Sequence, residues 1–186
     1  MSTTTQTGAT GGIERLRTML LEGGGLMATL VSSTPSAGEE ERDSSPAHLA
    51  AQGPRAEGRR EEYELLVEAI YEGYLLHYGT PRAMRVPEAD LRLLAGDRLY
   101  ALGLARLVEL GDTLAVAELA DTITLSALAQ GGGQEDLAAA IWLAGARAVG
   151  WGPSEEHRRA KELVCAGAGT AFEAMRTSGS ALPASP

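Results

Sequence analysis

The chain has 186 residues and a mass of 19.4 kDa, which suits one compact domain with flanking segments and excludes two full-sized enzyme domains. Alanine and leucine far outnumber isoleucine and valine, and aromatic residues make up only 4% of the chain, so the composition favours helices and argues against an all-β fold. The formal net charge is -9, and a chain of this sign repels a phosphate backbone, so we expect no nucleic acid partner.

The sequence offers few residues suited to a metal, a disulfide or a membrane. Cys165 is the single cysteine and the three histidines are scattered, which predicts a reducing compartment, no metal site and no cofactor. No apolar run approaches the roughly 18–20 residues that span a bilayer, and no basic residue precedes an apolar stretch as in a signal peptide. We therefore expect a cytoplasmic protein without a transmembrane segment, with Cys165 buried as a small apolar residue.

The amino-terminal part of the chain favours tail and linker over packed structure. Residues 1–12 and about 32–58 are rich in Ser, Thr, Gly, Pro and charge, so they bury too little to offset the entropy of ordering. Between them, isoleucine and leucine recur on one face of a short amphipathic helix near 13–31. We expect residues 1–58 to be mostly disordered, with this helix either docking on a partner or packing loosely on its own domain.

From Arg59 onward, apolar residues recur at helical spacing with few interruptions. Glu64, Glu68 and Glu72 stack at four-residue intervals on a different face from the apolar residues of the first helix. Short connections predict an antiparallel helical bundle over 59–176, followed by a disordered tail over 177–186. Its five predicted helices cover about 59–78, 86–110, 113–130, 134–149 and 154–176.

Asp97 is the polar residue that a helical wheel places among apolar side chains. On the second helix it falls in the same broad arc as Leu93, Tyr100 and Leu104. A carboxylate that faces a core must be paired, hydrogen-bonded or protonated. Asp97 therefore either bonds a neighbouring helix, for example through a tyrosine, or contacts a ligand.

His77 and a group of tyrosines are the other side chains suited to a contact site. His77 lies near a helix end, where the helix dipole favours an imidazolium, and it is either a packed or capping residue or a ligand contact. Tyr71, Tyr74 and Tyr78 have the spacing of a packed stripe, in the aromatic core or on a pocket or partner surface. Glycines inside the first two helices predict a close approach of the helices. No residue is assigned a catalytic role, and the candidate ligand or partner contacts are Asp97, Tyr100, Tyr74, His77 and Leu104.

One segment of the chain resembles a known family. It begins with Asp90-Leu91-Arg92-Leu93-Leu94-Ala95-Gly96-Asp97-Arg98-Leu99-Tyr100 and continues through Leu107, Gly111-Asp112, Leu119-Ala120 and Ile123. It is similar to the Leu-Ala-Gly-Asp helix region of the all-α polyprenyl diphosphate synthase fold. The resemblance is strongest to the smaller, non-catalytic subunit of bacterial two-component heptaprenyl diphosphate synthases, in which a helix of the same type follows the segment, as it does here.

The resemblance implies an accessory role in isoprenoid biosynthesis. Catalytic members of the fold use two Asp-Asp-x-x-Asp motifs to hold magnesium ions, which draw off the charge of the leaving diphosphate. This chain has no adjacent aspartate pair, so it is not expected to be an enzyme on its own. The resemblance implies a subunit that packs against a catalytic one and shapes the tunnel for the growing apolar chain, within a homo- or hetero-oligomer.

Two other interpretations stay open. The chain could be a helical protein-interaction or scaffold module that holds a partner with its amphipathic helix and a helical face, with no small-molecule site. It could also be an enzyme in which Asp97, His77 and tyrosines act on an isoprenoid-like substrate. An elongated apolar cavity beside Asp97 would favour the accessory subunit or the enzyme over the interaction module.

Overall fold

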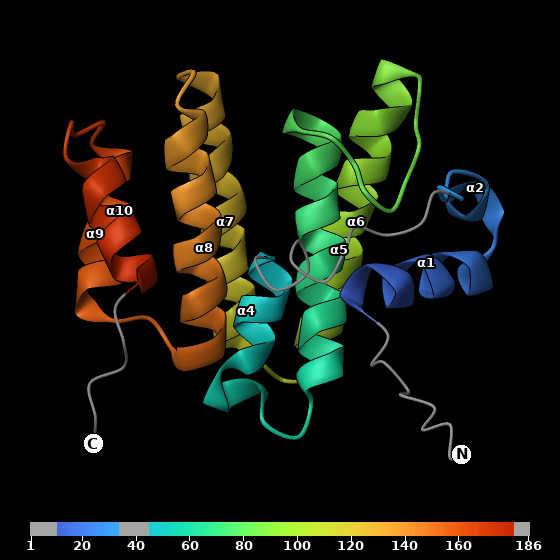
Figure 1. The fold of residues 1–186 in the computed structure, drawn as a ribbon, viewed down its shortest axis with the longest axis horizontal. Helices are drawn as coiled ribbons and strands as arrows, with labels where there is room; N and C mark the ends of the chain where they lie inside the picture. The colour runs from blue at the N-terminus through green and yellow to red at the C-terminus, as the bar shows by residue number, and fades with distance from the viewer. Residues whose placement is uncertain (1–10, 34–44, 181–186) are drawn as a thin grey trace, which may run out of the picture.

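The protein is helical throughout the part of the chain that its structure describes. The computed structural model (Figure 1) describes residues 11–33 and 45–180, and no β-strand occurs within these ranges, which confirms the expected all-α class. Residues 1–10, 34–44 and 181–186, where a tail and part of a linker are predicted, lie outside it. The helices are α1 (Gly12–Gly23), α2 (Gly25–Thr29), α4 (Pro46–Gln52), the 3-10 helix η1 (Pro54–Ala56), α5 (Arg60–Tyr78), α6 (Ala89–Glu109), α7 (Thr113–Gly131), α8 (Glu135–Trp151), α9 (Glu155–Cys165) and α10 (Ala171–Ser180).

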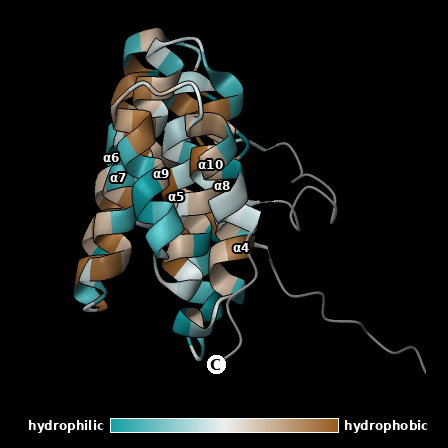
Figure 2. Ribbon diagram, turned by 90° about the vertical axis from the view of Figure 1, so that its left-hand side faces the viewer, coloured by the Kyte–Doolittle hydropathy of each residue, from teal (hydrophilic) through white to brown (hydrophobic). Residues whose placement is uncertain are grey.

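The long helices lie side by side in two layers. α6 packs mainly on α5, and α7 packs mainly on α8. In Figure 1, α6 and α7 lie behind α5 and α8, and in Figure 2 they lie along the left edge. α4 fits between α5 and α8 and contacts both, while α10 covers another side of α8 and contacts α9. Among the described residues, the helices that cover the layer of α6 and α7 therefore lie on its inner side.

The ends of the helices follow the local sequence signals in most places. The side chain of Asp112 caps α7 by accepting a hydrogen bond from the backbone N of Ala115 at 3.0 Å, and Ser154 caps α9 in the same way. The fifth predicted helix, over 154–176, is instead the two helices α9 and α10. The chain turns between them at Gly167, whose φ of 63° lies in the left-handed region that favours glycine.

The segment predicted as a linker contains a buried helix. Ala47 and Ala50 of α4 are fully buried. A Cβ at Gly53 would lie 2.2 Å from the backbone of Gly150 in α8, so the two backbones are in contact there. The composition of this segment suggested disorder because it is rich in Ser, Thr, Gly, Pro and charge, but its alanines are buried and close contact between backbones adds dispersion. The expectation of a linker is therefore wrong over 46–56.

The predicted amphipathic helix near 13–31 forms as α1 and α2 and packs on its own chain. Leu16 and Leu20 of α1 are buried in an apolar cluster with residues of α5, α6 and the segment between them. Arg15 pairs with Glu64 of α5, and Arg17 donates a hydrogen bond to the backbone carbonyl of Arg82 at 2.6 Å. α1 is thus held by both apolar contact and charge.

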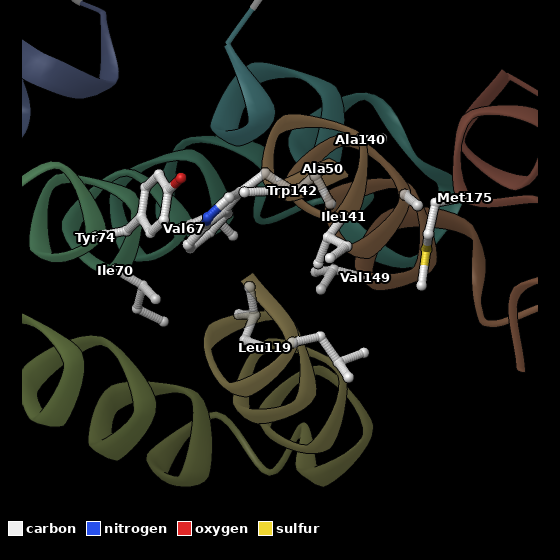
Figure 3. Close-up of a cluster of buried hydrophobic side chains, with 14 of the residues drawn as sticks. Ala50, Val67, Ile70, Tyr74, Leu119, Ala140, Ile141, Trp142, Val149 and Met175 are labelled. Carbon is white, nitrogen blue, oxygen red and sulfur yellow. The ribbon is translucent and has the colours of Figure 1, made fainter. Parts of the chain in front are cut away.

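The main apolar core lies between α5, α7 and α8. Trp142 of α8 is almost completely buried, and Figure 3 shows it between Val67 and Tyr74 of α5 on one side and Ile141 on the other. The rings of Tyr71 and Tyr74 lie 4.9 and 5.1 Å from the Trp142 ring, between centroids. Leu119 of α7 faces the same cluster. The core therefore depends on one large aromatic residue.

The carboxyl end of the described chain is more ordered than expected. Residues 177–180 continue α10, and Ser178 is buried, so the expectation of a tail is wrong for these four residues. Met175 of the same helix is fully buried and anchors it. Among the described residues, no helix combines the length and the apolar character needed to cross a membrane.

Gly53→Ala is expected to lower the free energy of unfolding by about 1–3 kcal/mol, the usual cost of adding a methyl group to a filled contact. The new Cβ would meet the backbone of Gly150, which no side-chain rotation can relieve. Urea denaturation followed by circular dichroism measures the change. Gly23→Ala, with no atom within 4 Å of the added Cβ, is the control, and an equal loss in both variants would contradict the contact.

Candidate functional site between α5 and α6

The structure brings three of the five predicted contact residues together. His77 lies in the last turn of α5, and Asp97 and Tyr100 lie on α6. The imidazole of His77 stacks on the ring of Tyr100, with centroids 5.3 Å apart and an interplanar angle of 2°. Oδ1 of Asp97 lies 3.2 Å from Nε2 of His77. These residues form one cluster at the contact between the two helices.

Tyr74 and Leu104, the other two predicted residues, belong mainly to the core. Leu104 is half-buried against it, and the hydroxyl of Tyr74 accepts a hydrogen bond from the side chain of Gln130 in α7 at 2.7 Å. The exposed ring of Tyr78 joins the two groups, because its centroid lies 5.5 Å from that of Tyr74 and 5.8 Å from that of His77. The predicted tyrosine stripe is thus core at Tyr74 and surface at Tyr78.

Three glycines bring the backbones of α5 and α6 into contact. A Cβ at Gly73 would lie 2.9 Å from the carbonyl oxygen of Gly96, and a Cβ at Gly96 would lie 2.6 Å from the His77 ring. Further along, a Cβ at Gly103 would lie 2.4 Å from the side chain of Ile70. The predicted close approach of these helices is therefore confirmed, and it is what places His77 against α6.

Asp97 faces solvent, not the core. Its side chain is 69% exposed, because the contact at Gly96 sets which face of α6 is buried, and Asp97 lies outside that face. The residues that α6 buries are Ala95, Gly96, Leu99, Gly103 and Leu107. The helical wheel identified the buried face of α6 from its bulky apolar residues, such as Leu93 and Leu104, and so placed that face on the wrong side of the helix. The prediction of a core-facing carboxylate is therefore wrong.

The His77 imidazole is held by packing. Its Nε2 atom is buried and makes no hydrogen bond, although the Asp97 carboxylate lies within ion-pair distance. A general acid or base must reach the proton that it transfers, and this nitrogen is closed off by the surrounding side chains. The arrangement instead presents a carboxylate beside aromatic rings at the surface, which suits contact with a polar group of a partner.

Burial raises the pKa of the Tyr100 phenol well above its ordinary value, and the nearby Tyr78, Tyr74 and Asp97 add to the effect. Tyr100→Phe should therefore leave the rise of phenolate absorbance around pH 10 unchanged, because Tyr100 is still protonated there. A spectrophotometric alkaline titration measures it, with near-ultraviolet circular dichroism as the control for fold. Any loss of amplitude in this pH range would contradict the prediction.

A buried row of glutamates on α5 is the polar cluster that the sequence analysis missed. Glu64, Glu68 and Glu72 are at most 6% exposed. The carboxylate of Glu72 accepts hydrogen bonds from three successive backbone N atoms, at 2.9 Å from Arg82, 2.8 Å from Ala83 and 3.1 Å from Met84. Glu72 therefore fixes the connection between α5 and α6.

Glu68 lies in the middle of this row and has the most perturbed acidity. It pairs with Arg82, whose guanidinium lies 5.0 Å from the centroid of the Tyr71 ring, and accepts a hydrogen bond from Ser45 at 3.2 Å. Burial raises the pKa of Glu68 to about 7; Arg82 opposes the rise and Glu72 adds to it. The four-residue spacing showed that the glutamates share a face, but not that arginines distant in sequence cover it.

Glu68→Gln should remove a pH dependence of stability. The pKa of Glu68 is higher in the folded protein than its usual value of 4.5, so the folded state binds more protons between pH 4.5 and about 7, and stability falls as pH rises through this window. The free energy of unfolding of the wild type, relative to the Gln variant, should therefore decrease between about pH 5 and about pH 8. Urea titrations measure it. Glu109→Gln, at an exposed carboxylate, is the control, and a difference independent of pH would refute the assignment.

A second buried polar cluster joins α9 to α7. Nε2 of His157 lies 3.1 Å from Oε2 of Glu118, and Nζ of Lys161 lies 3.0 Å from the same oxygen. Burial by itself raises the pKa of Glu118, but hydrogen bonds from His157 and Lys161 outweigh it and lower the pKa below its usual range. Ser178, 3.5 Å from His157, is buried and donates its hydroxyl proton to the carbonyl of Met175. This cluster is closed to substrate and serves the packing of the helices.

Other features of the described surface lie away from Asp97. Cys165 is exposed, contrary to expectation, because α9 ends at this residue. Hollows of about 470 and 440 Å³ both border Asp136 and Phe172, on α8 and α10. In the described ranges, no three His, Cys, Asp or Glu side chains are grouped as metal ligands would be.

The comparisons with protein-family models, with curated proteins and with solved structures found no match for this chain.

Proposed function

We propose that this chain is a non-catalytic accessory subunit, similar to the small component of a two-component polyprenyl diphosphate synthase, and that it binds a catalytic partner. In this proposal the long helices act as an antiparallel bundle, the chain has no catalytic activity alone, and its partner-dependent role lies in isoprenoid biosynthesis in the cytoplasm. The surface around Asp97 is assigned to the contact with the partner.

The proposal is supported by the position of the segment that resembles the polyprenyl diphosphate synthase fold and begins with Asp90 to Tyr100. Its residues Ala95 and Gly96 are buried at the contact with α5, while Asp97 points outward beside His77 and Tyr100. The same short sequence therefore sets the packing of α6 and presents one exposed carboxylate. Aromatic side chains are enriched at protein interfaces and the rim of an interface is polar, so an exposed acid flanked by aromatic side chains suits the rim of a contact with a second protein.

A second candidate function is a helical interaction module with no small-molecule site. The exposed apolar residues on α6 and α7, such as Leu94, Val108 and Leu128, favour it, since such residues mark interaction surfaces when they gather on one face. The hollows described above border Asp136 and Phe172 and not Asp97, so the cavity that would favour the accessory subunit is not among them. The two candidates differ in the partner that they require and in whether prenyl transfer depends on this chain.

Copurification from the native host separates the two candidates. An affinity-tagged chain should recover a prenyl synthase subunit that carries Asp-Asp-x-x-Asp motifs, identified by mass spectrometry. That subunit, assayed with an allylic diphosphate and isopentenyl diphosphate, should be more active or make longer products when the chain is added. Recovery of unrelated proteins only, by an intact folded chain, would refute the accessory-subunit function.

Asp97→Asn is expected to reduce the partner-dependent activity about tenfold or more, because a carboxylate that makes a charge-assisted contact at an interface is worth about 1.4 kcal/mol or more. The variant should melt like the wild type, since the side chain is largely exposed. Glu109→Gln, an exposed acid on the same helix, is the matched control. Equal activity of both variants would place the partner contact elsewhere.

A further inference from the structure

The outward side of α6 carries an apolar stripe that no helix of the described residues covers. Leu94 is 65% exposed and Val108 is 57% exposed, and the exposed Ala101 lies midway between them. A spacing of seven residues places all three on one face of the helix. This is the face opposite to the one that packs on α5, so the stripe follows from the glycine contact described above.

α7 continues this surface on the same side of the molecule. Leu114 and Leu128 are both exposed, and their separation of two heptads puts them on one face, with the exposed Asp121 at the heptad position between them and the exposed Ala117 beside them. α6 and α7 form one layer, visible along the left edge of Figure 2. The side chains of Val116 and Ile123 are half-buried against the core. The two stripes therefore belong to one largely apolar face.

The size of this face approaches that of a stable interface. A helix of 21 residues such as α6 is about 30 Å long and about 10 Å wide, so the two helices project about 600 Å², to which protruding side chains add. A standard protein interface buries about 800 Å² on each partner. Contiguous apolar patches on monomers rarely exceed a few hundred Å². The face is therefore large enough to bind a folded protein.

The charges on the face are balanced within the chain. Asp97 is followed by the exposed Arg98, Arg106 pairs with Glu109, and on α7 Asp121 accepts a hydrogen bond from Lys161. The whole chain has a net charge of -9, which opposes contact between copies through an ordinary part of the surface. A face with little net charge avoids this repulsion. An anionic membrane would instead require a basic rim, which the acidic chain does not supply.

We propose that the outer face of α6 and α7 is an interface at which two copies of this chain associate. The seven-residue stripe of α6, with alanine at its centre, allows the helices of the two copies to approach closely. An isologous contact of this kind closes a dimer, because the same face is used on both copies. The proposal goes beyond the accessory-subunit function and does not rest on it, since a second copy needs no catalytic partner. Because Asp97 lies on this face, a copy within the dimer does not bind a catalytic partner through Asp97 at the same time.

Sedimentation equilibrium of the purified chain, at about 1 to 100 µM, tests the proposal because dimers form by mass action. We expect a species of twice the 19.4 kDa chain mass at the upper end of the range. The double variant Leu94→Glu and Val108→Glu should sediment as a monomer over the same range and retain its helical circular dichroism. A wild type that is monomeric at every concentration would overturn the proposal.

The double variant Leu21→Glu and Leu26→Glu is the matched control, because these leucines are exposed on α1 and α2, away from the proposed interface. It should remain a dimer. If both double variants dimerise as the wild type does, the chain associates through a different surface and the proposal is wrong. If both are monomers, added negative charge and not the α6–α7 face controls association, which also overturns it.

Discussion

The contact between the backbones of α5 and α6 determines what the rest of the molecule presents. Because Gly73, Gly96 and Gly103 leave no room for a Cβ, α6 has to place its small residues against α5. Leu94, Val108 and Asp97 then face outward. Both the candidate contact site and the apolar outer face of α6 are consequences of this one geometric constraint, and neither would exist if α6 were rotated by half a turn.

The glutamates of α5 have a comparable organising role for the amino-terminal part of the protein. Glu64 holds α1 through Arg15, and Glu68 holds the segment after α5 through Arg82. A buried carboxylate is costly unless its oxygens are bonded, and Glu72 meets this requirement with backbone N–H groups alone. The bonds that satisfy these buried carboxylates therefore also hold three chain segments around α5, namely α1, the residue Ser45 before α4, and the segment after α5.

The sequence predicted the fold class and the four long helices because their apolar periodicity and caps, such as Asp112 for α7, are local signals. It failed for α4, where burial depends on contact between Gly53 and Gly150, nearly a hundred positions apart in sequence. The candidate site was predicted in part: His77, Tyr100 and Asp97 do meet, but the outward direction of Asp97 depends on the packing of α6. The partners of Glu68 could not be predicted, since no local pattern shows which distant arginine will cover a carboxylate.

The docking of α1 has a consequence for the order in which the protein is made. Every group that α1 uses to bury itself, from Glu64 to the carbonyl of Arg82, comes later in the chain, and so does Met84, which pairs with Val31 after α2. A ribosome releases the amino end first, so this segment emerges with its apolar leucines before any surface exists to receive them. α1 can pack on its own chain only after α5 and part of α6 have been synthesised. Until then, the face of α1 that carries Leu16 and Leu20 is exposed and can be bound by chaperones.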